Sequence, residues 1–153
     1  MILQMEWADA QLWRAVLAAA DRIDDRTREL VVHVHQVQHA FLGVWRGEPL
    51  DLRDPSSFGS LEAIRDWGRA AHLGIQAFLD SADDDAKQRP VVMPWATPEM
   101  AVPTLGETFV QVPMHSMYHR GQVNARLRTL GGEPPLVDFI FWVWSGKPRA
   151  AWD

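Results

Sequence analysis

The sequence contains no cysteine. A chain without thiols forms no disulfide, offers no thiolate to a metal ion and has no cysteine nucleophile of its own. Any metal ion must therefore be held by His, Asp or Glu side chains, and any sulfur chemistry needs a thiol from outside the chain.

The sequence also lacks the segments that are typical of membrane and nucleic-acid-binding proteins. No apolar run is long enough to span a bilayer, and the segment Met1–Trp7 lacks the basic and apolar parts of a secretory signal. We therefore expect a cytoplasmic protein with no membrane partner. The formal net charge is −5 and no run or helix face gathers Lys and Arg, so we expect no nucleic-acid partner.

What the sequence does contain is the composition of one globular domain. Its 153 residues, 47% hydrophobic and 23% charged, suffice to bury a core without cross-links. We predict a single domain over residues 1–153. Eight tryptophans are many for this length, and we assign them to packing or interfaces before ligand binding.

Four segments carry apolar residues at spacings of three and four, the pattern of amphipathic helices. They cover residues 2–20, 27–46, 61–82 and 104–130. Long connections that are rich in proline separate the second, third and fourth segments. The pattern predicts an all-α fold, a mainly antiparallel four-helix bundle with long crossover connections.

Polar residues mark the expected starts of these helices. Asp24 or Asp25 can cap the second helix and Ser60 the third. Thr104 and Glu107 have the spacing of a capping box before the fourth.

The spacing also assigns an inward face to each helix. On the first helix it selects Leu3, Trp7, Ala10, Trp13, Leu17 and Ala20; on the second, Leu30, Val34, Val37, Phe41 and Val44. Val31, Leu42 and Trp45 form another apolar strip on the second helix, which a monomer would leave in solvent. We therefore expect a homodimer in which this strip lies at the contact.

Two histidines lie on one face of the fourth helix. His115 and His119 are four residues apart, so their imidazoles lie one turn apart and can reach a single ion. They continue an apolar stripe between Val112 and Val123. Burying two imidazoles there is costly unless their nitrogens are satisfied, and a shared cation satisfies one nitrogen of each. The pair predicts a metal site, the alternative being two histidines with separate hydrogen bonds.

A zinc-type ion needs at least a third protein ligand. At about 100° per residue, His33 lies at the edge of the inward stripe of the second helix, whereas His39 points nearly opposite. His35 lies off that stripe and could pair with His39 as a rival site. We expect His72, which has no histidine at helical spacing, to be a hydrogen-bonded boundary residue. We choose His33 as the third ligand, with His35 its main competitor.

One motif resembles a known family. It runs His115-Ser116-Met117-Tyr118-His119-Arg120-Gly121-Gln122 and is followed by Leu130-Gly131-Gly132-Glu133-Pro134-Pro135. Together with weaker matches at Glu6–Asp9 and His33–Glu48, it resembles the DinB-like proteins, metal-binding four-helix bundles grouped with the YfiT and bacillithiol-transferase types. The resemblance spans most of the chain. It implies that one histidine of the second helix joins both histidines of the motif on a divalent ion, and the match from Phe41 to Gly47 selects His33.

The other residues of the motif have expected roles. Gln122 lies on the face of the histidine pair, and we assign it a contact with a metal ligand or with a bound cofactor. Arg120 lies one step round the helix, where a salt bridge to another helix is expected. We assign Tyr118, on a flank of the site, a structural role.

Three neutral histidines with an open position describe a catalytic type of metal site. Such a set suits several divalent ions, of which we favour zinc or nickel. The resemblance implies thiol-dependent transfer, in which a low-molecular-weight thiol attacks an electrophile, as in the bacillithiol, mycothiol and glutathione-linked members. The alternatives are a metal-dependent hydrolase, although Ser116 stands where the zinc-protease motif has Glu, and a non-catalytic metal-binding stress-response bundle.

Overall fold

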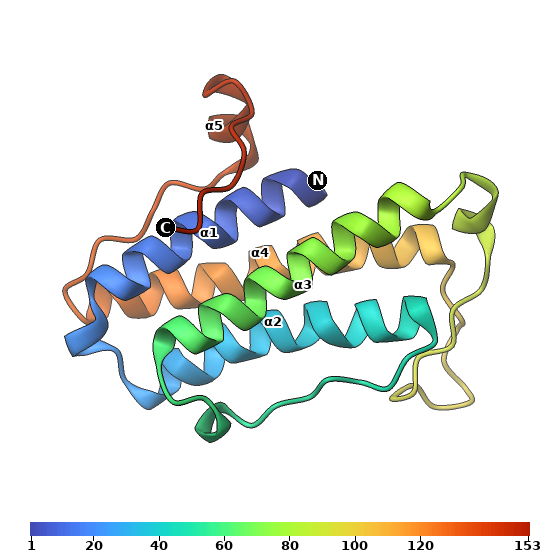
Figure 1. Ribbon diagram of the computed structural model, residues 1–153, viewed down its shortest axis with the longest axis horizontal. Helices are drawn as coiled ribbons and strands as arrows, with labels where there is room; N and C mark the ends of the chain where they lie inside the picture. Colours follow the sequence, from blue (N-terminus) through green and yellow to red (C-terminus); the bar gives the residue numbers. More distant parts are fainter.

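The computed structural model describes all 153 residues and contains five α-helices and no β-strand. The bundle consists of α1 (Ile2–Ala18), α2 (Asp25–Arg46), α3 (Leu61–Ser81) and α4 (Leu105–Thr129). A short helix, α5 (Phe139–Trp144), lies outside the bundle (Figure 1). Three 3-10 turns, η1 (Ala20–Arg22), η2 (Pro55–Ser57) and η3 (Asp85–Gln88), lie in the connections. The predicted all-α bundle is confirmed, and none of its helices has the length and apolar character that crossing a membrane requires.

The helices begin where side chains satisfy the first free backbone N–H groups. The Asp24 carboxylate accepts a hydrogen bond from the N–H three residues on at 2.9 Å, and the Ser60 hydroxyl does the same at 3.2 Å. Thr104 and Glu107 exchange the two bonds of a capping box at the start of α4. Gly47 ends α2 in the left-handed conformation, with φ of 68°. The three helix starts follow the sequence prediction.

The connections determine the direction of each helix. After α2, residues 47–60 return along the length of the bundle, so α2 and α3 run the same way while α1 and α4 run the other way (Figure 1). α2 packs against α3 and α4, and α1 packs against the same two helices. The expected long crossover is present, but the bundle mixes parallel and antiparallel neighbours, so the prediction of a mainly antiparallel arrangement is wrong.

Buried polar residues divide the core into two apolar clusters. One cluster is built around Trp13, Val31 and Leu127, and the other around Met5, Trp45 and Ile75. Six of the nine buried polar residues lie between the residues of these two clusters, and each of the four helices contributes at least one of them. They are Asp9, His35, Gln38, His72, Ser116 and Arg120. We call these six residues the polar layer.

The inward faces of α1 and α2 differ from the predicted ones. On α1, Leu3 is 57% exposed, and Met5 and Leu12 take inward positions that the prediction did not assign. On α2, the strip of Val31, Leu42 and Trp45 lies in the core, where each residue is at most 7% exposed. Helical spacing predicts that the polar residues of α2 lie outside, whereas two of them, His35 and Gln38, lie inside in the polar layer. The strip therefore cannot be a subunit contact.

A different surface leaves large apolar side chains in solvent. α5 projects from the bundle above α1 (Figure 1) and buries only Trp142, which packs with Trp7 and Ala8. The exposed residues of this surface, the α5 patch, are Leu136, Phe139, Ile140, Phe141 and Trp144. Exposed apolar residues gathered on one element are typical of contact surfaces.

We expect the α5 patch to be the contact of a homodimer. Aromatic side chains carry about 150–250 Å² each, so the patch exposes on the order of 500 Å² of apolar surface. A standard interface buries about 800 Å² per partner, of which somewhat more than half is apolar. One patch pairing with its copy therefore supplies the apolar share of such an interface. Light scattering should give about twice the chain mass of 17.4 kDa.

Replacing Ile140 and Trp144 together by Glu should return the mass to that of one chain, because like charges would meet at the contact. Val92→Glu is the matched control, since Val92 is 74% exposed on a loop away from α5. A wild-type mass of one chain at micromolar concentration would show that the patch does not pair with a second copy.

Candidate metal centre

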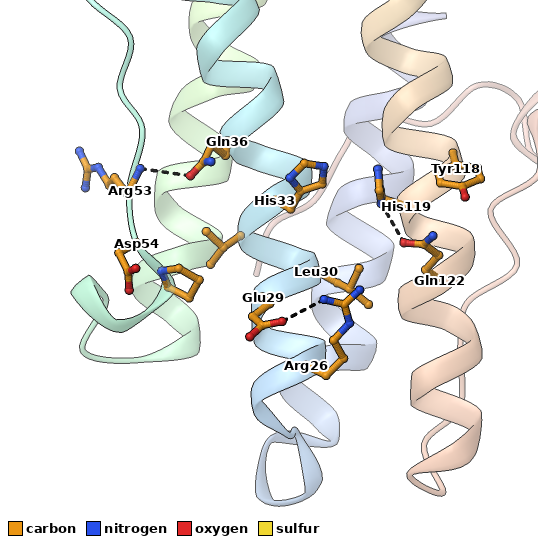
Figure 2. A pocket seen from close by; sticks show the side chains of 12 residues that line it. Arg26, Glu29, Leu30, His33, Gln36, Arg53, Asp54, Tyr118, His119 and Gln122 are labelled. Atoms are coloured by element: carbon orange, nitrogen blue, oxygen red, sulfur yellow. Dashed lines mark hydrogen bonds and ion pairs between the residues drawn. The ribbon is translucent and has the colours of Figure 1, made fainter. Parts of the chain in front are cut away.

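The packing of α2 against α4 brings His33 together with His115 and His119. The ring centroid of His33 lies 5.2 Å from that of His115 and 4.5 Å from that of His119, and the latter two are 4.4 Å apart. One nitrogen from each ring lies within 4.8 Å of the other two. Figure 2 shows His33 and His119 facing each other from the two helices. The three imidazoles are therefore placed to share one ion.

The three histidines lie at the edge of the core. Each is half-buried, whereas Ser116 and Arg120 take the inward positions of α4 and are 1% and 3% exposed. The expectation that His115 and His119 occupy core positions is therefore wrong, because the inward face of α4 is rotated toward its polar residues. An edge position leaves one side of the site open, which a catalytic type of metal site requires.

Gln122 sets the tautomer of His119. Its Oε1 atom lies 2.8 Å from Nδ1 of His119 and can only accept, so that nitrogen carries the proton. Nε2 then has a free lone pair, which is the form that binds a metal. Gln122 thus contacts one of the expected ligands, in agreement with the sequence prediction.

His115 has an unsatisfied nitrogen. Its Nδ1 atom is buried and has no hydrogen-bond partner. Leaving a buried donor or acceptor unpaired costs about 1–3 kcal/mol. His115 therefore has a buried imidazole nitrogen without a protein partner and lies beside two other imidazoles. This is what we expect of a histidine that binds an ion.

The electrostatics favour neutral imidazoles. Burial, followed by the neighbouring His119 and His33, lowers the pKa of His115 to about 4. Burial also lowers the pKa of His33, followed by the effects of His119 and Arg26. A metal ion binds imidazole only in its neutral form, so at neutral pH these two rings need lose no proton first.

Beside the three histidines lies a polar cavity of about 590 Å³. His33, His119 and Gln122 form part of its wall, together with Tyr118, which is 66% exposed and has its ring 5.0 Å from that of His119. Its charged and amide lining includes Arg26, Glu29, Gln36, Arg53 and Asp54 (Figure 2). A small polar molecule can therefore reach the imidazoles from solvent.

A second group of possible ligands lies inside the polar layer. Oxygen and nitrogen atoms of Asp9, His35 and His72 also lie within 4.8 Å of one another. These atoms already bond within the protein: Asp9 accepts from His72 at 2.9 Å, and His35 accepts from Trp13 at 2.7 Å. An ion would have to displace these bonds, so we interpret the group as structural.

The structure therefore separates the histidines that the sequence left as alternatives. His35, the main competitor, lies in the core and donates from Nδ1 to Gln38, whereas His33 faces the pair on α4. His39 stacks on Trp67 with ring centroids 4.3 Å apart and does not pair with His35 as a rival site. His72 is 2% exposed, so the prediction of a boundary position is wrong, although its hydrogen bond is present.

Asp9 is the centre of the polar layer. Its carboxylate accepts from Arg120 at 2.5 Å, from Gln38 at 2.7 Å and from His72. Burial alone would raise the pKa of Asp9, but the charge of Arg120 and the hydrogen bond from His72 outweigh it and hold the pKa below its usual range. Asp9 thus stays a carboxylate, and the salt bridge expected for Arg120 is confirmed.

Gln38 links this centre to α4 and to His35. It donates to Asp9 and, at 3.0 Å, to Ser116, and it accepts from His35. Gly68 of α3 makes room for the ring, since a Cβ there would lie 2.4 Å from Nε2 of His35. Helical spacing in the sequence assigned no role to Asp9 or Gln38. The available signal was that Asp9 lies four residues from both Met5 and Trp13, on one helical face.

The fold and the site define an all-α bundle with a candidate three-histidine metal centre between two of its helices. The sequence model of the DinB family matches residues 24–150, a range that includes all three histidines. The chain belongs to the DinB family. No curated protein is similar enough in sequence to be matched with it.

The polar layer generates a prediction about stability. Asp9→Ala leaves the Arg120 guanidinium buried without a counter-ion, which costs about 3–5 kcal/mol in other buried pairs. We expect a loss of this order in urea unfolding followed by circular dichroism. The double variant Asp9→Ala/Arg120→Met should be more stable than Asp9→Ala, because it buries no charge.

Asp66→Ala provides the control. Asp66 also pairs with an arginine, at 2.8 Å, but its side chain is 63% exposed, so its loss should change stability little. Equal stability of Asp9→Ala and Asp66→Ala would show that the polar layer does not stabilise the fold.

Proposed function

We propose that this protein is a metal-dependent transferase that joins a low-molecular-weight thiol to an electrophile, with His33, His115 and His119 as the ligands of a divalent ion. The observation that carries the proposal is the convergence of the three imidazoles beside an open polar cavity, in whose wall two of them, His33 and His119, lie. Membership of the DinB family supports the metal, and the donor set suits zinc or nickel.

A divalent ion held by three neutral imidazoles supplies a Lewis acid with open positions, which can lower the pKa of a thiol or of water. The protein groups orient the site. Gln122 fixes His119, and the polar layer holds the backbone of α4 through Ser116 and Arg120, which flank the histidines in sequence.

The polar cavity suits a small charged thiol. Its volume of about 590 Å³ falls within the usual range for small-molecule sites, roughly 300–1,000 Å³. Arg26 and Arg53 on one hand, and Glu29 and Asp54 on the other, give it both signs of charge. Such a lining suits a thiol that carries amino and carboxylate groups, and a chain without cysteine must take its thiol from solution.

The alternative hypothesis is a metal-dependent hydrolase. Such an enzyme needs a general base near the ion. Ser116, in the place of the zinc-protease glutamate, is buried and accepts a hydrogen bond from Gln38. Glu29, a carboxylate of the cavity wall, pairs with Arg26 at 3.0 Å. These contacts favour transfer over hydrolysis, while a bundle that only binds metal would show neither activity.

We expect wild-type protein to keep about one divalent ion per chain after dialysis. His33→Ala, His115→Ala and His119→Ala should each lose it, because two imidazoles bind such an ion much less tightly. Gln122→Ala should weaken the affinity about 10–100-fold, as losses of such supporting contacts do. Elemental analysis per chain measures each outcome.

His39→Ala is the matched control, because His39 is a partly buried histidine of α2 that lies outside the site. It should retain the metal. Stoichiometric metal in both His115→Ala and His119→Ala, with folding confirmed by circular dichroism, would refute the site.

The dependence of turnover on an added thiol distinguishes the transferase from the hydrolase and from a bundle that only binds metal. With monochlorobimane as electrophile, metal-loaded protein should accelerate formation of the fluorescent thiol adduct over the uncatalysed rate, and His119→Ala should return it to that rate. A panel of small thiols identifies the one preferred. Turnover of ester or amide substrates without thiol would favour the hydrolase, and no turnover with any thiol would leave a metal-binding bundle.

A further inference from the structure

The three-histidine site borders a second pocket besides the polar cavity. His115 lies in the wall of a pocket of about 260 Å³, which His33 and His119 do not line. Gln36 borders both hollows. The three imidazoles thus lie between two spaces, with His33 and His119 on one side and His115 on the other.

The second pocket has a different chemistry from the first. Its apolar lining comes from α2 and from the two long connections: Val37, Ala40, Phe41, Leu52 and Trp95. The rings of Phe41 and Trp95 meet edge to face, with centroids 5.6 Å apart. Apart from His115, its polar members are the amides Gln36 and Gln111, and no Asp, Glu, Lys or Arg lines it. An uncharged, flat apolar group is what this lining would hold best.

We propose that this pocket, the acceptor pocket, binds the electrophile, and that the electrophiles are uncharged molecules carrying one aromatic ring or a short aliphatic chain. This inference rests on the proposed thiol transfer. An apolar cavity of about 150 Å³ holds benzene, so 260 Å³ accommodates a single substituted ring. The amides of Gln36 and Gln111 can each donate a hydrogen bond to a polar substituent or accept one from it.

The position of the acceptor pocket relative to the polar cavity fits a two-substrate reaction. A thiol in the polar cavity and an electrophile in the acceptor pocket approach the imidazoles from different sides. The thiol gives its proton to solvent, its sulfur forms a bond to the electrophilic carbon, and the leaving group departs with the electron pair of the broken bond. Holding both reactants at the same place supplies the gain in rate that proximity provides.

The pocket can be tested without turnover. The probe is 4-fluorotoluene, an unreactive single ring, and its binding to metal-loaded protein is followed by fluorine NMR without thiol. Ala40→Leu adds three carbons to the wall of the pocket and should weaken binding at least tenfold. Trp95→Ala should also weaken it, and since Trp95 is 50% exposed on a loop, this variant should keep its fold.

Ala63→Leu is the matched control, because it adds the same group at an exposed position of α3. It should leave probe binding unchanged. Metal content is measured for every variant and should equal that of the wild type. No binding of the probe to wild type, or equal binding by Ala40→Leu, Trp95→Ala and Ala63→Leu, would overturn the acceptor pocket.

A kinetic comparison links the pocket to the reaction. With one thiol, the ratio of kcat/KM for 4-fluorobenzyl chloride to that for iodoacetamide should fall at least tenfold in Ala40→Leu. An unchanged ratio would overturn the inference while leaving thiol transfer intact. If the wild type transfers no thiol but holds metal, the proposed function fails, and the fluorine NMR titration still decides whether the pocket binds an apolar ring.

Discussion

The carboxylate of Asp9 and the guanidinium of Arg120 form the contact on which the geometry of the whole molecule depends. The pair joins α1 to α4, and its neighbours His72 and Gln38 bring in α3 and α2. Contacts between apolar side chains would let a helix shift along its axis or rotate about it at small cost in free energy. Each of these hydrogen bonds, in contrast, requires one position of the helix along its axis and one rotation. The polar layer therefore sets the register of all four helices between two apolar clusters.

This register explains where the three imidazoles lie. Because Ser116 and Arg120 must turn inward to reach Gln38 and Asp9, the residues just before them, His115 and His119, are rotated to the edge of α4. There they meet His33 and open toward solvent. The buried arrangement that stabilises the bundle thus also gives the site its access.

The sequence predicted those features that depend on residues close together in the chain. Helix starts at Asp24, Ser60 and Thr104 depend on residues within one turn, and the pairing of His115 with His119 depends only on helical spacing. The direction of His33 on the second helix selected it as the third ligand, and the family resemblance selected the same residue. What the sequence did not reveal depends on distant partners: Asp9 is 111 residues from Arg120, and two of the three partners of Gln38, Asp9 and Ser116, lie on other helices. A helical wheel of α2 contains no residues of the other helices. The orientation of α2 therefore differs from the predicted one, because its polar residues bond to those helices.

The crossover between α2 and α3 has a consequence for how the choice of reactants could change by mutation. Leu52 borders the acceptor pocket and Arg53, its neighbour, borders the polar cavity, and both belong to a connection outside the bundle helices. Leu52 is 56% exposed, so replacing it disturbs little of the core. In the proposed reaction, recognition of both reactants would thus depend partly on two adjacent positions outside the bundle helices. Mutations in this connection would then change which reactants are accepted while the four bundle helices stay the same.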